Sequence, residues 1–312
     1  MNLILPALAQ LSLFLIISPL VTGVIRTMKA RFQTRRGPSI WQPYLDLHKL
    51  LRKGMIIPDT ASWLFSATPY VVFLTAAMVS LMIPMVATEA PLSLFGGVLA
   101  VVYLLALGRF FLALGGLDTG TSFGGLGSSR EMTISAIAEP AMMVAIFTVA
   151  IAANSTNLSE VAKSAVGQSW RFLAPSQMLA FGAMFIVLIA ETGRIPVDNP
   201  ATHLELTMIH EAMILEYSGP YLALIEWGAS LKQLVLMTLL INTFVPFGLS
   251  PGWTIPGIAI GLGFYLLKLL IICCLIVLVE TTNAKMRLFR VPELLAVAFI
   301  LGALALISTF LF

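Results

Sequence analysis

Charged residues are scarce in this chain of 312 residues: they make up 11% of it, whereas 59% of the residues are hydrophobic. A soluble domain has roughly 25% charged residues, so this chain has too little polar surface to face water on every side. Its solvent is therefore predicted to be mostly lipid. The net charge of +3 is small, and no basic face with nucleic-acid readout chemistry is recognisable, so no nucleic-acid partner is expected.

Cysteine is also scarce. The two cysteines, Cys273 and Cys274, are adjacent and lie inside an apolar run. Neighbouring side chains on a helix point about 100° apart, so this pair forms neither an ordinary disulfide nor a chelating pair. Iron–sulfur clusters and zinc ribbons need more thiolates at set spacings. No cofactor and no metal site is therefore expected in this chain, and any redox metals would lie on other subunits.

Long apolar runs dominate what is present. Windows of about 20 apolar residues predict membrane-spanning helices. The first is expected to be a retained span, not a cleaved signal, because it lacks a basic leader and a basic cluster follows it. We expect an all-α fold, a single membrane domain of residues 1–312. Eight spans are predicted: Leu3–Ile25, Leu64–Val86, Leu92–Leu114, Met132–Ala153, Ser176–Ala190, Leu222–Val245, Ile255–Val279 and Leu294–Phe310.

Basic residues are distributed unequally between the two sets of loops that these spans create. Thirteen of the 18 lysines and arginines fall in one set, against only Lys163 and Arg171 in the other. The positive-inside rule places the richer set in the cytoplasm and both termini outside. The polar connections 27–62, 115–131 and 191–219 would then form a docking face for partners on the cytoplasmic side of the inner membrane.

The first of these connections contains KARFQTRRGPSIWQPYLDLHKLLRKG. It combines a basic arm, a turn and a predicted amphipathic helix over residues 43–52 with an apolar stripe of leucines. One interpretation is an interfacial helix held by anionic lipid. The other is a docking surface, or a gateway for a lipophilic substrate. The candidate docking residues here are Arg35, Arg36, Gly37, Pro38, Asp46 and Lys49, and Arg130 and Arg194 complete the set.

The second connection, GGLDTGTSFGGLGSSREMTISAIAEP, is rich in glycine. It has no GK[ST] sequence and is followed by a span, so it fits a phosphate-binding loop poorly. The glycines are expected to allow tight backbone turns under a docked partner, with Ser128 or Ser129 as the cap of the following helix. Glu139 then falls about two turns inside the membrane, where an acid is a functional candidate. Its expected partners are Arg130, Arg109 or Lys232, and a purely structural ion pair is the alternative.

The third connection, 191–219, carries a high density of acids. Pro196 is expected to end a helix, and a new helix capped by Asn199 is predicted over residues 200–217. His203 and His210, with the neighbouring acids, could relay protons. Their spacing of seven residues is too long for simple chelation, and no HExxH is present. A solvated amphipathic helix lying on the membrane is the alternative. The acids are Glu191, Asp198, Glu205, Glu211 and Glu216.

Two lysines lie in predicted spans. Lys268 is near the middle of its span, so its side chain is expected to face the bundle interior. It either holds a proton or pairs with a neighbouring acid. No residue of the chain is expected to be catalytic. The complete predicted relay set is Glu139, Glu191, Asp198, Glu205, Glu211, Glu216, Lys232, Lys268, His203 and His210.

Several of these motifs resemble one family. RRGP followed by QPYLDLHKL, then ETGRIPVD and LEYSGPYLALIEW, resemble subunit 1 of complex I, the membrane subunit at the quinone site. Respiratory members carry a close glutamate run after the aspartate, whereas this chain has Ala201 and His203 there. DNPATHLELTMIHEAMILEYSG, and the acid-led segment beginning at Glu280, are instead similar to the homologous subunit of group 4 energy-converting [NiFe] hydrogenases, of the hydrogenase-4 and formate hydrogenlyase type.

This resemblance implies a non-catalytic subunit of an oxidoreductase complex. It would anchor a peripheral [NiFe]/Fe–S module and couple its electron transfer to proton or sodium translocation. The implied partners are hydrogenase large and small subunits, antiporter-like membrane subunits and the lipid bilayer, with the Fe–S clusters and NiFe centre on the partners. Three alternatives stay open: a quinone-site subunit of a complex I-like NADH/quinone oxidoreductase, a stand-alone ion transporter, for which inverted repeats are missing, and an inert anchor.

Overall fold

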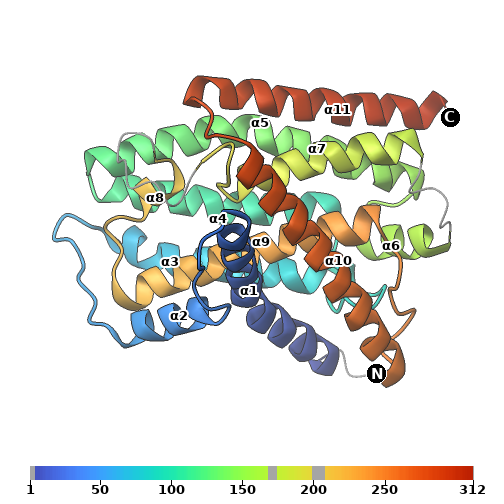
Figure 1. The fold of residues 1–312 in the computed structure, drawn as a ribbon, viewed down its shortest axis with the longest axis horizontal. Coiled ribbons are helices and arrows are strands. Elements are labelled where there is room, and N and C mark those ends of the chain that lie inside the picture. Colours follow the sequence, from blue (N-terminus) through green and yellow to red (C-terminus); the bar gives the residue numbers. More distant parts are fainter. Residues whose placement is uncertain (1–3, 168–173, 199–207, 312) are drawn as a thin grey trace.

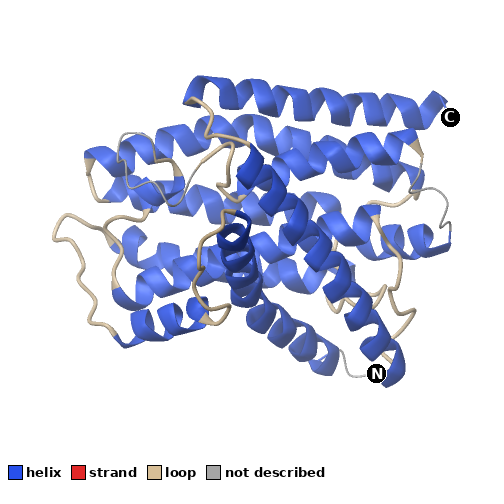
Figure 2. Ribbon diagram, viewed as in Figure 1, coloured by secondary structure: helices blue, strands red, loops and turns tan. Residues whose placement is uncertain are grey.

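The computed structural model describes residues 4–167, 174–198 and 208–311. Helices account for the regular secondary structure of these ranges, and no strand occurs in them (Figure 2), which confirms the predicted all-α class. The elements are α1 (Ile4–Phe32), α2 (Gln42–Arg52), α3 (Trp63–Met82), η1 (Ser93–Phe95), α4 (Val98–Asp118), α5 (Ser122–Ala152), α6 (Leu158–Gly167), α7 (Pro175–Glu191), α8 (His210–Met213), α9 (Gly219–Phe244), α10 (Ile255–Thr282), η4 (Leu288–Arg290) and α11 (Val291–Leu311).

Seven helices of the described ranges are long and apolar enough to cross a membrane: α1, α3, α4, α5, α9, α10 and α11. The fifth predicted span corresponds to α7, an apolar helix of 17 residues. At 1.5 Å per residue it is about 25 Å long, a little short of the ~30 Å hydrocarbon core. The eight predicted spans thus each correspond to a helix. Both termini lie at the same end as α6, opposite α2 and α8 (Figure 1), and the membrane side of that end stays a prediction.

The helices pack as a bundle in which α4 lies between α3 and α5, and α11 runs along α5 and α7. Helix α10 crosses obliquely in front of α9, beside α1 (Figure 1). Buried side chains such as Phe14, Met142, Leu188 and Leu236 form the main core. Helix α11 exposes Ile300 and Ile307 on its outer face. Exposed aliphatic side chains on a spanning helix fit contact with lipid tails.

The predicted glycine-rich loop 115–131 is largely helical, which corrects the sequence-based expectation. Helix α4 continues to Asp118, α5 begins at Ser122, and the cap is Thr121, whose Oγ1 accepts a hydrogen bond from the Gly124 N–H at 3.3 Å. A Cβ at Gly124 would lie 2.2 Å from the Gly116 carbonyl oxygen. The glycines therefore let neighbouring helices approach closely, as small residues do in membrane bundles, instead of forming the tight turns of a loop.

One of these glycines supports a stability prediction. A Cβ at Gly127 would lie 2.9 Å from both Ala212 Cβ and the Ile209 oxygen, beside α8, whereas one at Gly125 would have nothing within 4 Å. Gly127→Ala is expected to destabilise the protein by about 1–3 kcal/mol through overpacking. Gly125→Ala, the matched control, is expected to be neutral or to stabilise α5 by up to about 1 kcal/mol. Thermal denaturation of both variants checks this, and equal midpoints would contradict it.

The helix predicted over 200–217 is only partly accounted for. In its described part, 208–217, helix is confined to His210–Met213, which is α8; Asn199, His203 and Glu205 lie outside the described residues. Tertiary contacts explain why α8 is short. The Tyr217 ring stacks on Phe65 at 4.0 Å, and its hydroxyl donates to the Phe65 oxygen at 3.2 Å. Burial raises the Tyr217 pKa, so this phenol remains a donor at neutral pH. The helix predicted over 43–52 is confirmed as α2.

Candidate functional site

Arg109 is the centre of a buried charge cluster. It extends from α4 with a side chain that is 3% exposed, and its Nη2 lies 2.6 Å from Glu191 Oε2 at the end of α7. Its Nη1 lies 2.9 Å from Glu139 Oε1 and its Nε 3.7 Å from Glu131 Oε1, both on α5. A guanidinium presents donors in a planar fork and can therefore serve several carboxylates at once. Of the three alternative partners expected for Glu139, Arg109 is the one that it contacts.

A second cation joins the same cluster. Lys232 on α9 places its Nζ 2.8 Å from Glu191 Oε2, so this carboxylate bridges Arg109 and Lys232. Lys232, one of the three alternative partners expected for Glu139, therefore pairs with Glu191. Isolated charges are very costly in a low-dielectric interior, and mutual pairing makes this burial tolerable. We call Arg109, Glu131, Glu139, Glu191 and Lys232 the charge cluster.

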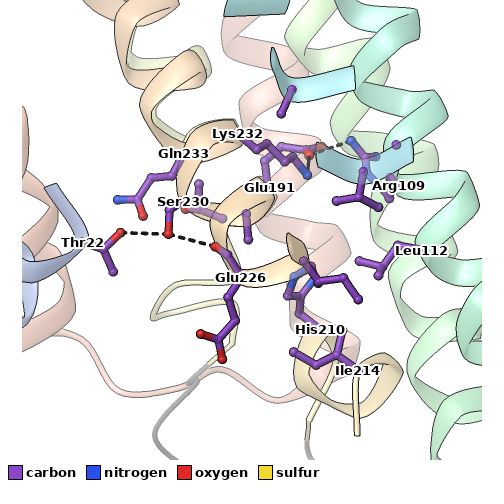
Figure 3. A pocket seen from close by; sticks show the side chains of 18 of the residues that line it. Thr22, Arg109, Leu112, Glu191, His210, Ile214, Glu226, Ser230, Lys232 and Gln233 are labelled. Carbon is purple, nitrogen blue, oxygen red and sulfur yellow. Dashed lines mark hydrogen bonds and ion pairs between the residues drawn. The ribbon is translucent and has the colours of Figure 1, made fainter. Parts of the chain in front are cut away.

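The charge cluster borders a cavity with a volume of ≈ 200 Å³. In Figure 3, Arg109, Glu191 and Lys232 converge at one end of this cavity, while the Glu226 carboxylate points away from them. The wall is apolar at Leu112 and Ile214, which lie on the side of His210. Residues of α1, α2, α3, α4, α5, α7, α8 and α9 line the cavity. The cavity thus combines apolar walls with a few convergent polar groups, as ligand and ion sites do.

A second charge network lies beside the first. Glu280 on α10 is 4% exposed and accepts from two cations, Lys29 on α1 and Arg194 just after α7, each at 2.8 Å. Arg194 Nη2 also donates to Gln233 Oε1 at 2.9 Å, and Gln233 follows Lys232 on α9. The two networks therefore meet on adjacent residues of one helix. Arg194, predicted to dock a partner, has its guanidinium committed to contacts inside the chain.

The segment after α7 is held by a third set of contacts. Asp198 Oδ1 pairs with Lys285 Nζ at 2.6 Å, and Asp198 Oδ2 accepts the Ile209 and His210 N–H groups at 3.1 and 3.4 Å. The Met286 N–H donates to the Pro196 oxygen at 2.9 Å. The connection between α10 and α11 is thereby fastened to residues 192–198. These contacts fix the position of the Glu191 end of α7 relative to the cavity.

The predicted relay residues are only partly brought together. Glu191, Asp198, His210, Glu211 and Lys232 line the cavity, whereas Glu139 reaches the charge cluster through Arg109. Glu216 is exposed. Lys268 lies elsewhere: its Nζ donates to Asn242 Oδ1 at 3.2 Å and to the Val245 oxygen at 3.1 Å, an amide and a carbonyl at the end of α9 instead of a carboxylate.

The predicted docking residues divide into two groups. Arg35, Arg36, Pro38 and Lys49 have exposed side chains, and Gly37 and Asp46 are half-buried beside them. Asp46 accepts from Gln42 Nε2 at 2.8 Å within α2 and also lines the cavity. Arg130 instead turns inward, where its Nη1 donates to the Met208 oxygen at 2.9 Å.

Sequence reasoning missed several members of these networks. Arg109 was named only as a possible partner, although a cation inside an apolar span is as strong a functional signal as the acid Glu139. Glu131, Lys29 and Glu280 had no such signal, because they lie near the ends of predicted spans, where charges are ordinary. Gln233 lies inside a predicted span but is uncharged. Among the described residues, no group of three His, Cys, Asp or Glu side chains is placed to hold a metal ion.

The cluster has a simple chemical consequence. It contains two cations, Arg109 and Lys232, and three carboxylates, so its formal charge is −1 when all five groups are ionised. One proton or one monovalent cation at the cavity neutralises it. Buried net charge is unfavourable, and the adjacent network of Lys29, Arg194 and Glu280, with a formal charge of +1 when all three groups are ionised, offsets part of it.

The sequence matches a protein family and several known proteins over most of its length. The NADH dehydrogenase family matches residues 5–311. The chain is 36% identical to hydrogenase-4 component C of Escherichia coli (strain K12), covering 97% of this chain and 95% of that protein. It is 33% identical to formate hydrogenlyase subunit 4 of the same organism, covering 99% of each. With an NADH-quinone oxidoreductase subunit of Rubrobacter xylanophilus the identity is 27%, over 77% of this chain and 73% of the relative.

A solved structure shares the fold. The membrane-bound sulfane sulfur reductase, an archaeal respiratory membrane complex, contains a chain that superimposes with a TM-score of 0.85. The match covers 98% of this chain and 99% of that one at 19% sequence identity. At this identity, the likeness establishes the arrangement of helices and nothing about chemistry.

Proposed function

The chain belongs to the NADH dehydrogenase family of complex I-type membrane subunits, and on that premise we propose that it is the ion-translocating membrane-arm subunit of an energy-converting hydrogenase. It is a membrane subunit of a complex I-like oxidoreductase complex, and its partners are other subunits of that complex. The hydrogenase assignment is supported by two relatives above 30% identity that span nearly the whole chain, both named as hydrogenase or formate hydrogenlyase components.

The observation that carries the ion-coupling role is the charge cluster at the cavity. Five ionisable side chains from four helices would not be kept at this depth for packing alone, because apolar residues of similar volume commonly stabilise a fold equally well. A cluster with one excess negative charge can hold a proton or a sodium ion and release it when its surroundings change. Coupling then requires that the partner's redox reaction bias two states of the cluster.

The remaining parts of the assignment follow from this role. The Fe–S clusters and the NiFe centre would reside on hydrogenase large and small subunits, and antiporter-like subunits would extend the membrane arm. Lys49 on α2, with the connection 191–219 and the part of the connection 27–62 outside residues 31–41, would form the face that receives the peripheral module. The excess of basic residues at that face supports a cytoplasmic position at the inner membrane.

A quinone-site function is the second candidate. The cavity has apolar side chains, including Leu47, Val72 and Ile225, beside its charged end, which suits a ligand with an apolar body and a polar head. Relatives named as NADH-quinone oxidoreductase subunits are also found, at 27–30% identity. This candidate requires that the complex retain a quinone and reduce it.

The test uses the whole complex purified through a tag on this chain and reconstituted in liposomes with a reduced viologen dye as electron donor. We expect hydrogen evolution accompanied by ion uptake, which a protonophore abolishes if the ion is a proton and a sodium ionophore abolishes if it is sodium. Hydrogen evolution without any ion movement would contradict the coupling role. Quinone reduction, with no hydrogenase subunit in the complex, would establish the second candidate instead.

A further inference from the structure

A concave basic surface lies at the end of α1, separate from the cavity and the charge cluster. It has a volume of ≈ 550 Å³, and Arg31, Arg35, Arg36, Ile40 and Trp41 contribute to its lining. Arg31 belongs to the last turn of α1, whereas Arg35 and Arg36 lie beyond the helix end in the connection to α2. We call it the arginine groove.

The arginine groove has a defined shape because its loop is folded back on α1. Thr27 Oγ1 donates to the Pro38 oxygen at 3.0 Å, and a Cβ at Gly37 would lie 2.8 Å from the Ala30 Cβ. Farther along, a Cβ at Gly23 would lie 2.1 Å from the Ile40 oxygen. Glycine at these two positions thus allows the loop to contact the helix directly. A ligand would meet a preformed surface and lose little affinity to loop ordering.

The charges in the groove are not neutralised from within. The guanidinium groups of Arg31, Arg35 and Arg36 form no ion pair in the described ranges, unlike Arg109 and Arg194, whose terminal nitrogens pair with buried carboxylates. The helix dipole at the C-terminus of α1 stabilises the positive charge of Arg31 but not those of Arg35 and Arg36, because its effect fades beyond the last turn. Three unpaired guanidinium groups around one hollow are suited to a phosphate, whose oxygens match their fork geometry.

The rim of the groove points to the source of that phosphate. Trp41 is 62% exposed and Phe32 is 54% exposed, both next to the arginines and at the end of a spanning helix. Indole rings at that position are typical of the membrane–water interface, and basic pockets there bind anionic headgroups. We propose that the arginine groove binds the phosphate headgroup of an anionic phospholipid, with its acyl chains against the exposed apolar side chains. An acidic protein partner would match the charges but leave this apolar rim unused.

The test compares lipid bound to two variants of the assembled complex. The triple variant Arg31→Gln/Arg35→Gln/Arg36→Gln removes the groove's charges. The control Arg52→Gln/Lys53→Gln/Arg290→Gln removes the same charge from exposed positions outside the groove. Native mass spectrometry with added phosphatidylglycerol should show roughly 100-fold weaker binding to the groove variant, because each basic residue contributes about 1 kcal/mol. The control should bind like the wild type, and phosphatidylcholine should bind weakly to all three.

Three outcomes would overturn the proposal. Equal phosphatidylglycerol binding by the groove variant and the control places the lipid elsewhere. Inorganic phosphate binding as tightly as phosphatidylglycerol makes free phosphate the ligand. Loss of a protein subunit with unchanged lipid binding makes the groove a protein interface. If the groove variant fails to assemble, tryptophan fluorescence provides a test with the arginines intact. Brominated phosphatidylglycerol should quench the fluorescence of the wild type, and Trp41→Phe should lack the part of this quenching that is due to Trp41. Identical quenching of the two proteins would also overturn the proposal.

Discussion

Replacing Arg109 with glutamine is expected to lower the free energy of unfolding by about 3–5 kcal/mol, the usual consequence of removing one partner from a buried ion pair. The variant would leave Glu139 and Glu131 without a cation and Glu191 with Lys232 only. Carboxylates stranded in a low-dielectric interior must take up protons or draw in water. The measurement is the thermal denaturation midpoint of the purified complex in detergent, together with the yield of assembled complex.

The matched control is Lys163→Gln. Lys163 also pairs with two glutamates, Glu89 at 2.7 Å and Glu160 at 3.1 Å, but its side chain is 38% exposed. Exposed pairs contribute only up to about 1 kcal/mol, so the control should denature close to the wild type. Arg109→Lys keeps the charge without the fork and should fall between the two. Equal midpoints for Arg109→Gln and Lys163→Gln would show that the buried ion pairs of the cluster contribute no more to the free energy of unfolding than exposed ones do.

The parts of the fold that depend on local composition could be predicted from the sequence. Spanning helices follow from runs of apolar residues, because a span satisfies its own backbone hydrogen bonds and needs no distant partner. Glu139 was recognisable for the same reason: an acid in such a run is conspicuous, and few cations are available at its depth. The amphipathic α2 likewise follows from leucine spacing within eleven residues.

The parts that depend on distant contacts could not be predicted. Glu191 and Lys232 are 41 positions apart, and nothing in either neighbourhood indicates that α7 and α9 bring their side chains to 2.8 Å. The glycines between 115 and 131 have the composition of a loop, and the close approach of Gly124 to the Gly116 backbone and of Gly127 to α8 explains why they occupy helices. Within residues 208–217, the contacts made by Asp198 and Tyr217 limit the helix to His210–Met213, although the local sequence favours a longer one.

The second large effect is expected at Glu191, whose single oxygen Oε2 contacts both Arg109 and Lys232. Glu191→Gln removes one negative charge, so the formal charge of the cluster changes from −1 to 0. The cluster would then no longer favour binding of one further proton or sodium ion. A coupling free energy of about 1–3 kcal/mol is typical between linked sites, so ion uptake per hydrogen evolved should fall by roughly tenfold.

The comparison variant for this prediction is Glu226→Gln. Both carboxylates belong to residues that line the same cavity, but Glu226 is exposed and directed away from Arg109 and Lys232 (Figure 3). Its loss should leave ion uptake near the wild-type value, and Glu191→Asp, which keeps the charge, should recover part of the loss. Hydrogen evolution from a viologen dye should persist in all three variants, because the proposed function assigns the redox chemistry to partner subunits. If Glu191→Gln and Glu226→Gln reduced ion uptake equally, general electrostatics of the cavity would account for both, and the bridging position of Glu191 would have no role of its own.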